Sequence, residues 1–84
     1  MTDDLSKKRE LADSAKALIE DKAFSSAILS LRKRWFEELM NATGTDEKLE
    51  LIARTKALEA IPAELGVLIN DFKMALHRQK QNAA

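Results

Sequence analysis

The sequence predicts an all-α protein built as a long antiparallel helical hairpin. The 84 residues include 13 alanines and 12 leucines, which favour helices, but only one valine and no tyrosine for strands. One cluster, residues 41–45, has the composition of a turn, and helical spacing of apolar residues precedes and follows it. We therefore expect a single helical domain over residues 1–84, with helices at about 3–41 and 46–78 joined by a turn at 41–45.

The first predicted helix, at about 3–41, carries two apolar stripes that point in different directions. One stripe runs from Leu11 to Ile19 and the other from Phe24 to Leu39. At about 100° per residue the two stripes lie on nearly opposite sides of a straight helix. Either the helix breaks near Asp21, or it is continuous and each half packs on a different partner. Because Glu20-Asp21-Lys22 contains no strong helix breaker, the continuous helix is preferred.

The predicted turn and the start of the second helix depend on two residues. Gly44 suits a left-handed position after a helix, and Thr45 suits the N-cap of the next one. Because short connections join antiparallel neighbours, the two helices are expected to pack side by side.

The second predicted helix has a stripe that repeats every seven residues: Leu51, Leu58, Leu65 and Phe72. Pro62 interrupts it, and a proline inside a helix removes one hydrogen bond and clashes with the preceding turn. The phase of the stripe nevertheless continues past this residue. A continuous helix kinked at Pro62 is therefore preferred to a break at residues 60–61 with Pro62 beginning a third helix.

The charge balance argues against several classes of protein. The chain has 14 basic and 14 acidic residues, evenly divided between its halves, which disfavours a strongly basic nucleic-acid binder or a membrane-surface helix. The absence of cysteine excludes a disulfide scaffold and a zinc finger. The N-terminal residues do not resemble a signal peptide, and no apolar run approaches the length of a membrane span. With no export signal, the expected location is the cytosol.

The segment 28–40 is apolar over about half of its helical circumference, more than one neighbouring helix covers. Two helices in a small domain do not bury all of this surface, so we expect a homo-oligomer or a larger protein partner. Arg32, Trp35 and Phe36 are the residue types that dominate interfaces, although both aromatics also suit an intramolecular core. The expected interface residues are Arg32, Trp35, Phe36, Leu39, Met40, Leu58, Leu65 and Phe72.

Three basic segments allow a competing interpretation as a small nucleic-acid-binding regulator. Residues 32–34 are consecutive cations, but they diverge around the helix, and Lys33 and Arg34 can each pair with a glutamate four residues later. The other two segments lie near the chain ends, where an antiparallel hairpin brings them together. The candidate nucleic-acid contacts are Lys7, Lys8, Arg78 and Lys80.

The sequence offers no set of residues for catalysis. His77 is the only histidine, and there is no cysteine, phosphate-binding glycine loop or metal-ligand motif to act with it. The mid-helix serines have no neighbouring base. We therefore expect a protein that is not an enzyme and that uses no cofactor or metal.

Two segments resemble small all-helical proteins encoded by tailed bacteriophages and prophages. They are residues 31–40, with the sequence LRKRWFEELM, and residues 58–72, which contain LEAIP and INDF. The resemblance covers roughly residues 18–75. It implies a structural, assembly, packaging or host-modulating accessory protein, and it supplies no catalytic residues.

Overall fold

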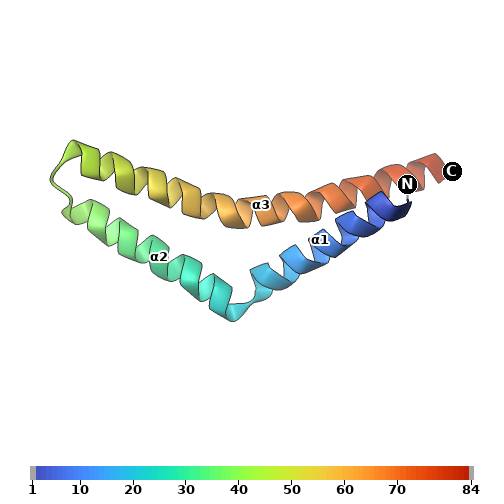
Figure 1. Cartoon of the computed structure of the whole chain (residues 1–84), viewed down its shortest axis with the longest axis horizontal. Coiled ribbons are helices and arrows are strands. Elements are labelled where there is room, and N and C mark those ends of the chain that lie inside the picture. The colour runs from blue at the N-terminus through green and yellow to red at the C-terminus, as the bar shows by residue number, and fades with distance from the viewer. Residues whose placement is uncertain (1, 84) are drawn as a thin grey trace.

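The computed structural model describes residues 2–83, with side chains from Asp3 to Asn82, and this part of the chain is almost entirely helical. Its three helices are α1 (Thr2–Glu20), α2 (Lys22–Asn41) and α3 (Thr45–Ala83). Helices α1 and α2 form a V, and α3 runs antiparallel to both across its open side (Figure 1). The prediction of an all-α fold is confirmed, but the two-helix hairpin is wrong.

The V bends at Asp21, so the preferred continuous helix over 3–41 is also wrong. Asp21 has extended backbone angles (φ −70°, ψ 125°), and its Oδ1 accepts a hydrogen bond from the Phe24 N–H at 2.8 Å. The Ser25 hydroxyl donates to the Ile19 carbonyl at 3.1 Å. Asp21 therefore acts as the N-cap of α2, in the position where a short acceptor side chain satisfies a free N–H.

The same bend brings both apolar stripes of the V onto α3. Ala15 and Phe24 lie nine residues apart, which places them on opposite sides of a straight helix. With the break between them, Ala15 is buried and Phe24 is half-buried. The change in direction of the apolar stripe between Ile19 and Phe24 is thus the sequence feature that indicates the break.

Helix α1 packs on α3 through small residues. Ala12 and Ala15 are buried, whereas Leu11 and Leu18 of the predicted apolar face are exposed. Phe72 of α3 is bulky and half-buried, and the Arg9 guanidinium lies 5.4 Å from the centre of its ring. Small side chains on one helix against large ones on its neighbour give an interdigitated contact.

The turn between α2 and α3 differs in detail from the prediction. Helix α2 ends at Asn41, and Ala42 is buried in an extended conformation. Gly44 has no positive φ, so the left-handed position predicted for it is not formed. Instead its carbonyl accepts the Lys48 N–H at 3.1 Å, which makes Gly44, rather than Thr45, the residue that precedes the first turn of α3.

Helix α3 continues through Pro62 and extends five residues beyond the predicted end at about 78. It bows toward the V near its middle (Figure 1), as expected where a proline removes a helical hydrogen bond. Leu51 and Leu58 are buried, and Leu65 and Phe72 are half-buried. The predicted heptad stripe is therefore the face that α3 turns toward α1 and α2.

The molecule is a thin rod with a small core. Its extents are 61 × 25 × 17 Å and its radius of gyration is 18.1 Å, against about 12 Å for a compact domain of this length. The chain exposes 6662 Å², about a third more than the roughly 5,000 Å² typical of its mass. None of its side chains within the described range is fully buried. The rod therefore leaves an unusual share of its surface uncovered.

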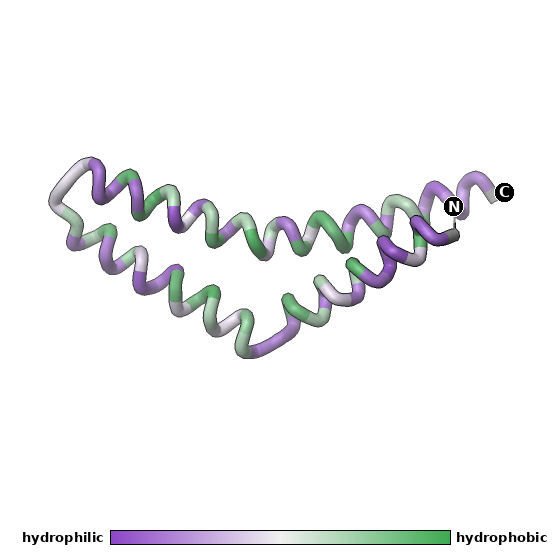
Figure 2. Tube along the Cα trace, viewed as in Figure 1, coloured by the Kyte–Doolittle hydropathy of each residue, from purple (hydrophilic) through white to green (hydrophobic). Residues whose placement is uncertain are grey.

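Polar and apolar residues alternate along all three helices (Figure 2). Within residues 2–83, none of the helices combines the length and the apolar character required to cross a membrane.

Candidate protein-interaction surface

Two adjoining hollows form a groove between α2 and α3, and Arg32 lines both of them. The first, of about 250 Å³, lies at the bend of the V, and the second, of about 350 Å³, lies farther toward the turn. We call their combined lining the α2–α3 groove. Its residues are Ile19, Phe24, Ser25, Ile28, Leu29, Arg32, Phe36 and Leu39 on one side, and Ile52, Thr55, Lys56, Glu59 and Pro62 of α3 on the other.

Helical spacing explains why the α2 wall of the groove is apolar and open. Ser25, Leu29, Arg32 and Phe36 follow one another at intervals of three or four residues and so share one face. This face lies beside the half-buried one that contacts α3. Leu29 and Phe36 are each 59% exposed, and Met40, one turn beyond Phe36 on the same face, is 68% exposed. The stripe is a helix face without a partner inside this chain.

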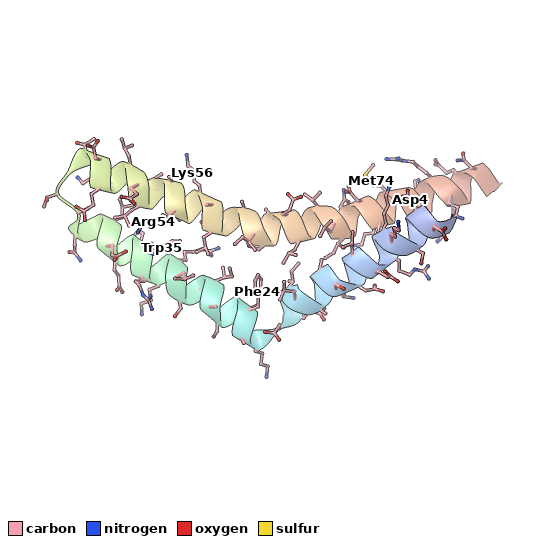
Figure 3. The ribbon with its side chains drawn as sticks, in the orientation of Figure 1. Asp4, Phe24, Trp35, Arg54, Lys56 and Met74 are labelled. Atoms are coloured by element: carbon pink, nitrogen blue, oxygen red, sulfur yellow. The ribbon has the colours of Figure 1, made fainter. Side chains whose placement is uncertain are left out.

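The opposite wall comes from α3, where Ile52, Lys56, Glu59 and Pro62 have the same helical spacing. Ile52 is the large apolar side chain of this wall and is partly exposed. Lys56 projects from the outer side of α3, away from α2 (Figure 3). The floor between the walls contains Thr55, whose hydroxyl is satisfied by the Leu51 carbonyl at 2.9 Å. Apolar groups therefore line most of the groove.

One ion pair crosses the groove at its middle. The Arg32 Nε lies 3.7 Å from Oε1 of Glu59, and both side chains are about half exposed. An exposed pair of this kind contributes at most about 1 kcal/mol to stability, so its main effect is to place opposite charges on facing walls.

The eight predicted interface residues occupy three different environments. Arg32, Phe36 and Met40 lie on the exposed α2 face. Trp35 and Leu39 are half-buried, and Trp35 lies on the side of α2 turned toward α3 (Figure 3). The remaining three, Leu58, Leu65 and Phe72, belong to the contact between α3 and the V. The intramolecular-core alternative is therefore wrong for Phe36.

Several groove residues were not among the predicted set. Leu29 was detectable, because it precedes Phe36 by one heptad on the same helix face. Ile52 and Glu59 were not, because their position opposite α2 depends on how α3 is rotated about its axis. That rotation follows from the contact between the two helices and leaves no local signal in the sequence.

The candidate nucleic-acid residues lie at the opposite end of the rod, where α1 and the end of α3 are side by side (Figure 1). Lys8 and Arg78 line one hollow of about 380 Å³, so the prediction that the terminal basic segments approach each other is confirmed for these two residues. Asp4 lines the same hollow, and its carboxylate lies 3.7 Å from the Lys8 ammonium. Lys7 and Lys80 are exposed and do not line it.

The i, i+4 pairs predicted on α2 do not form. Neither Lys33 with Glu37 nor Arg34 with Glu38 comes within 4 Å. All four side chains are exposed, where water solvates them as well as a partner would. An i, i+4 ion pair does form in α3, where Arg54 lies 2.6 Å from Glu50.

Over the described side chains, no group of three or more histidine, cysteine, aspartate or glutamate residues is arranged to hold a metal ion.

Comparisons with models of protein families, with curated proteins and with solved structures find no match to this chain. The structure thus defines an elongated three-helix protein with an open apolar groove.

Proposed function

We propose that this chain is a non-enzymatic protein–protein interaction module that acts by burying the α2–α3 groove against another protein surface. The observation that carries the proposal is the stripe of large exposed apolar side chains on α2, Leu29, Phe36 and Met40. Contiguous apolar surface on a soluble domain marks an interaction site, and aromatic residues with a neighbouring arginine are common interface anchors.

The surface area of the rod supports the same proposal. The excess over a compact protein of its mass is about 1,600 Å², whereas a standard interface removes about 800 Å² from each partner. Association through the groove therefore fits within the surface that the fold leaves uncovered.

The resemblance of residues 31–40 and 58–72 to helical phage proteins supports a more specific role. In this role the chain is a small oligomeric structural, assembly or accessory protein of a phage, located in the bacterial cytoplasm or in the virion. Mass spectrometry of purified particles and of assembly intermediates tests it. Absence of the chain from both would count against a structural or assembly role.

A matched pair of leucines tests the interaction itself. Leu29 in the groove and Leu49 on α3 outside it are 59% and 60% exposed, so Leu29→Ser and Leu49→Ser make the same chemical change at equal exposure. We expect the first variant to lose bound protein in affinity capture from the producing cells, and the second to retain it. Equal capture by both variants and the wild type would refute a role for the groove.

A second candidate function is nucleic-acid binding, and the observation that favours it is the approach of Lys8 to Arg78 in the terminal hollow. Phosphate binding by these cations would weaken steeply with salt. A mobility-shift titration at low salt with the wild type and with Lys8→Ala/Arg78→Ala tests it. The nearby Asp4 and the zero net charge favour the interaction module.

A further inference from the structure

We propose that the occupant of the α2–α3 groove is the groove of a second copy, in a two-fold dimer whose Arg32 side chains pair with Glu59 of the partner subunit. The inference rests on the proposed interaction function and names its partner and geometry. It predicts a four-helix interface made of α2 and α3 from each copy.

Charge complementarity points to a second copy. The groove carries a cation on its α2 wall and an anion on its α3 wall, 3.7 Å apart, within apolar surroundings. Lys56, the third charged residue of the lining, projects away from α2 (Figure 3). In a two-fold interface the same surface supplies both sides, so a surface with a cation and an anion on facing walls can be complementary to itself. The net charge of zero also removes long-range repulsion between copies.

The surface that the whole rod leaves uncovered exceeds the roughly 800 Å² per copy that a dimer of standard size buries. If each copy buries about half of its own excess surface of roughly 1,600 Å², the two copies form an interface of standard size. Leu29, Phe36 and Ile52, which are exposed in the single chain, would form its apolar centre. The interface would then have an apolar core crossed by ion pairs.

The ion pair also selects the orientation of the two copies. A two-fold axis that runs along the groove places α2 of one copy over α3 of the other, so that Arg32 meets Glu59 of the partner subunit. An axis across the groove places α2 over α2 and brings two Arg32 side chains together, which like-charge repulsion disfavours. The charges therefore favour a parallel dimer, with both α2–α3 turns at one end.

Charge reversal tests the pairing. In Arg32→Glu the proposed contact becomes four carboxylates, and in Glu59→Arg it becomes four guanidinium groups. We expect each variant alone to dimerise at least tenfold more weakly than the wild type in sedimentation experiments. Arg34→Glu, on the same helix but outside the groove, is the control and should dimerise like the wild type.

An equimolar mixture of Arg32→Glu and Glu59→Arg distinguishes contacts between copies from contacts within one. Each chain in the mixture has lost its internal ion pair, but each contact between the two different chains joins a glutamate to an arginine. The mixture should therefore recover the mass of a dimer. Circular dichroism should show unchanged helix content in both variants, because an exposed pair contributes little to folding.

A label at the turn tests the orientation. The chain has no cysteine, and a Cβ at Gly44 would meet nothing within 4 Å, so a spin label can be attached to Gly44→Cys. Fifteen residues separate position 44 from Glu59, or about 22 Å along a helix. The parallel dimer should give a distance below about 30 Å between the two labels. The alternative dimer, in which α2 lies over α2 and the copies are antiparallel, would give about 45 Å or more.

Three results would overturn the proposal: a wild type that stays monomeric at millimolar concentration, a charge mixture that stays monomeric, or a label distance near 45 Å. None of these would by itself refute the interaction function, which the Leu29→Ser and Leu49→Ser comparison decides. Conversely, Leu29→Ser could dimerise like the wild type while the charge mixture still recovers the dimer. That result would support the pairing of Arg32 with Glu59 but would exclude a role for the apolar groove.

Discussion

Replacing Asp21 by alanine should destabilise the fold through loss of a single hydrogen bond. In the structure the Asp21 carboxylate accepts the Phe24 N–H at 2.8 Å, and this bond begins α2 at the bend of the V. Loss of an N-cap of this type costs about 1 kcal/mol. For a domain of this size that corresponds to a fall in melting temperature of about 4–8 °C. Thermal unfolding followed by circular dichroism, at one fixed protein concentration, measures it.

Two further variants separate the hydrogen bond from the charge. Asp21→Asn keeps an acceptor at the N-cap, so it should melt within about 2 °C of the wild type. Asp13→Ala removes an exposed carboxylate from the middle of α1 and should not lower stability, because alanine is the better helix former. The capping argument is refuted if Asp21→Ala melts like the wild type, or if Asp21→Asn falls as far as Asp21→Ala.

Three other substitutions, one of them with a matched control, test the packing by denaturant unfolding. Leu58→Ala removes a side chain that is only 5% exposed and should lower the free energy of unfolding by about 2–5 kcal/mol; a loss below 1 kcal/mol would contradict its place in the core. Ala15→Leu should cost about 1–3 kcal/mol because α1 and α3 leave no room there, while Ala17→Leu on the exposed side should be nearly neutral; equal effects would contradict the close packing. Arg9→Ala should cost about 0.5–1 kcal/mol through its contact with the Phe72 ring, and no loss would show that the contact is not populated.

The helical class and the face that α3 turns inward were predictable because they depend on local spacing. The repeat of Leu51, Leu58, Leu65 and Phe72 identifies that face directly. The continuity of α3 through Pro62 was also predictable, since the phase of the repeat does not change there.

The break at Asp21 was harder to predict because an aspartate between two charged residues is compatible with both a helix interior and an N-cap. Helix propensity favours continuity, whereas the reversal of the apolar stripe requires a break once α3 is the common partner of both stripes. Tertiary packing decides between them. The same holds for Ala12 and Ala15, which are buried in preference to Leu11 because the facing surface of α3 is bulky.

The candidate site was predictable only in part. The exposed aromatic Phe36 and its neighbour Arg32 follow from one helix considered alone. The opposite wall, with Ile52 and Glu59, depends on the packing of α3 against α2 residues that lie 13 or more positions away in the sequence. No local pattern encodes those contacts.

The shared use of α3 has a consequence for how the molecule opens. Helices α1 and α2 pack on different halves of α3 and approach each other only at the bend (Figure 1). Cooperativity between the two halves of the rod therefore passes through two narrow links: the bend at Asp21, and the backbone of α3 across the turn that lacks the Pro62 hydrogen bond. Amide protons of α1 and of α2 should then exchange with solvent at different rates, as two partly independent units.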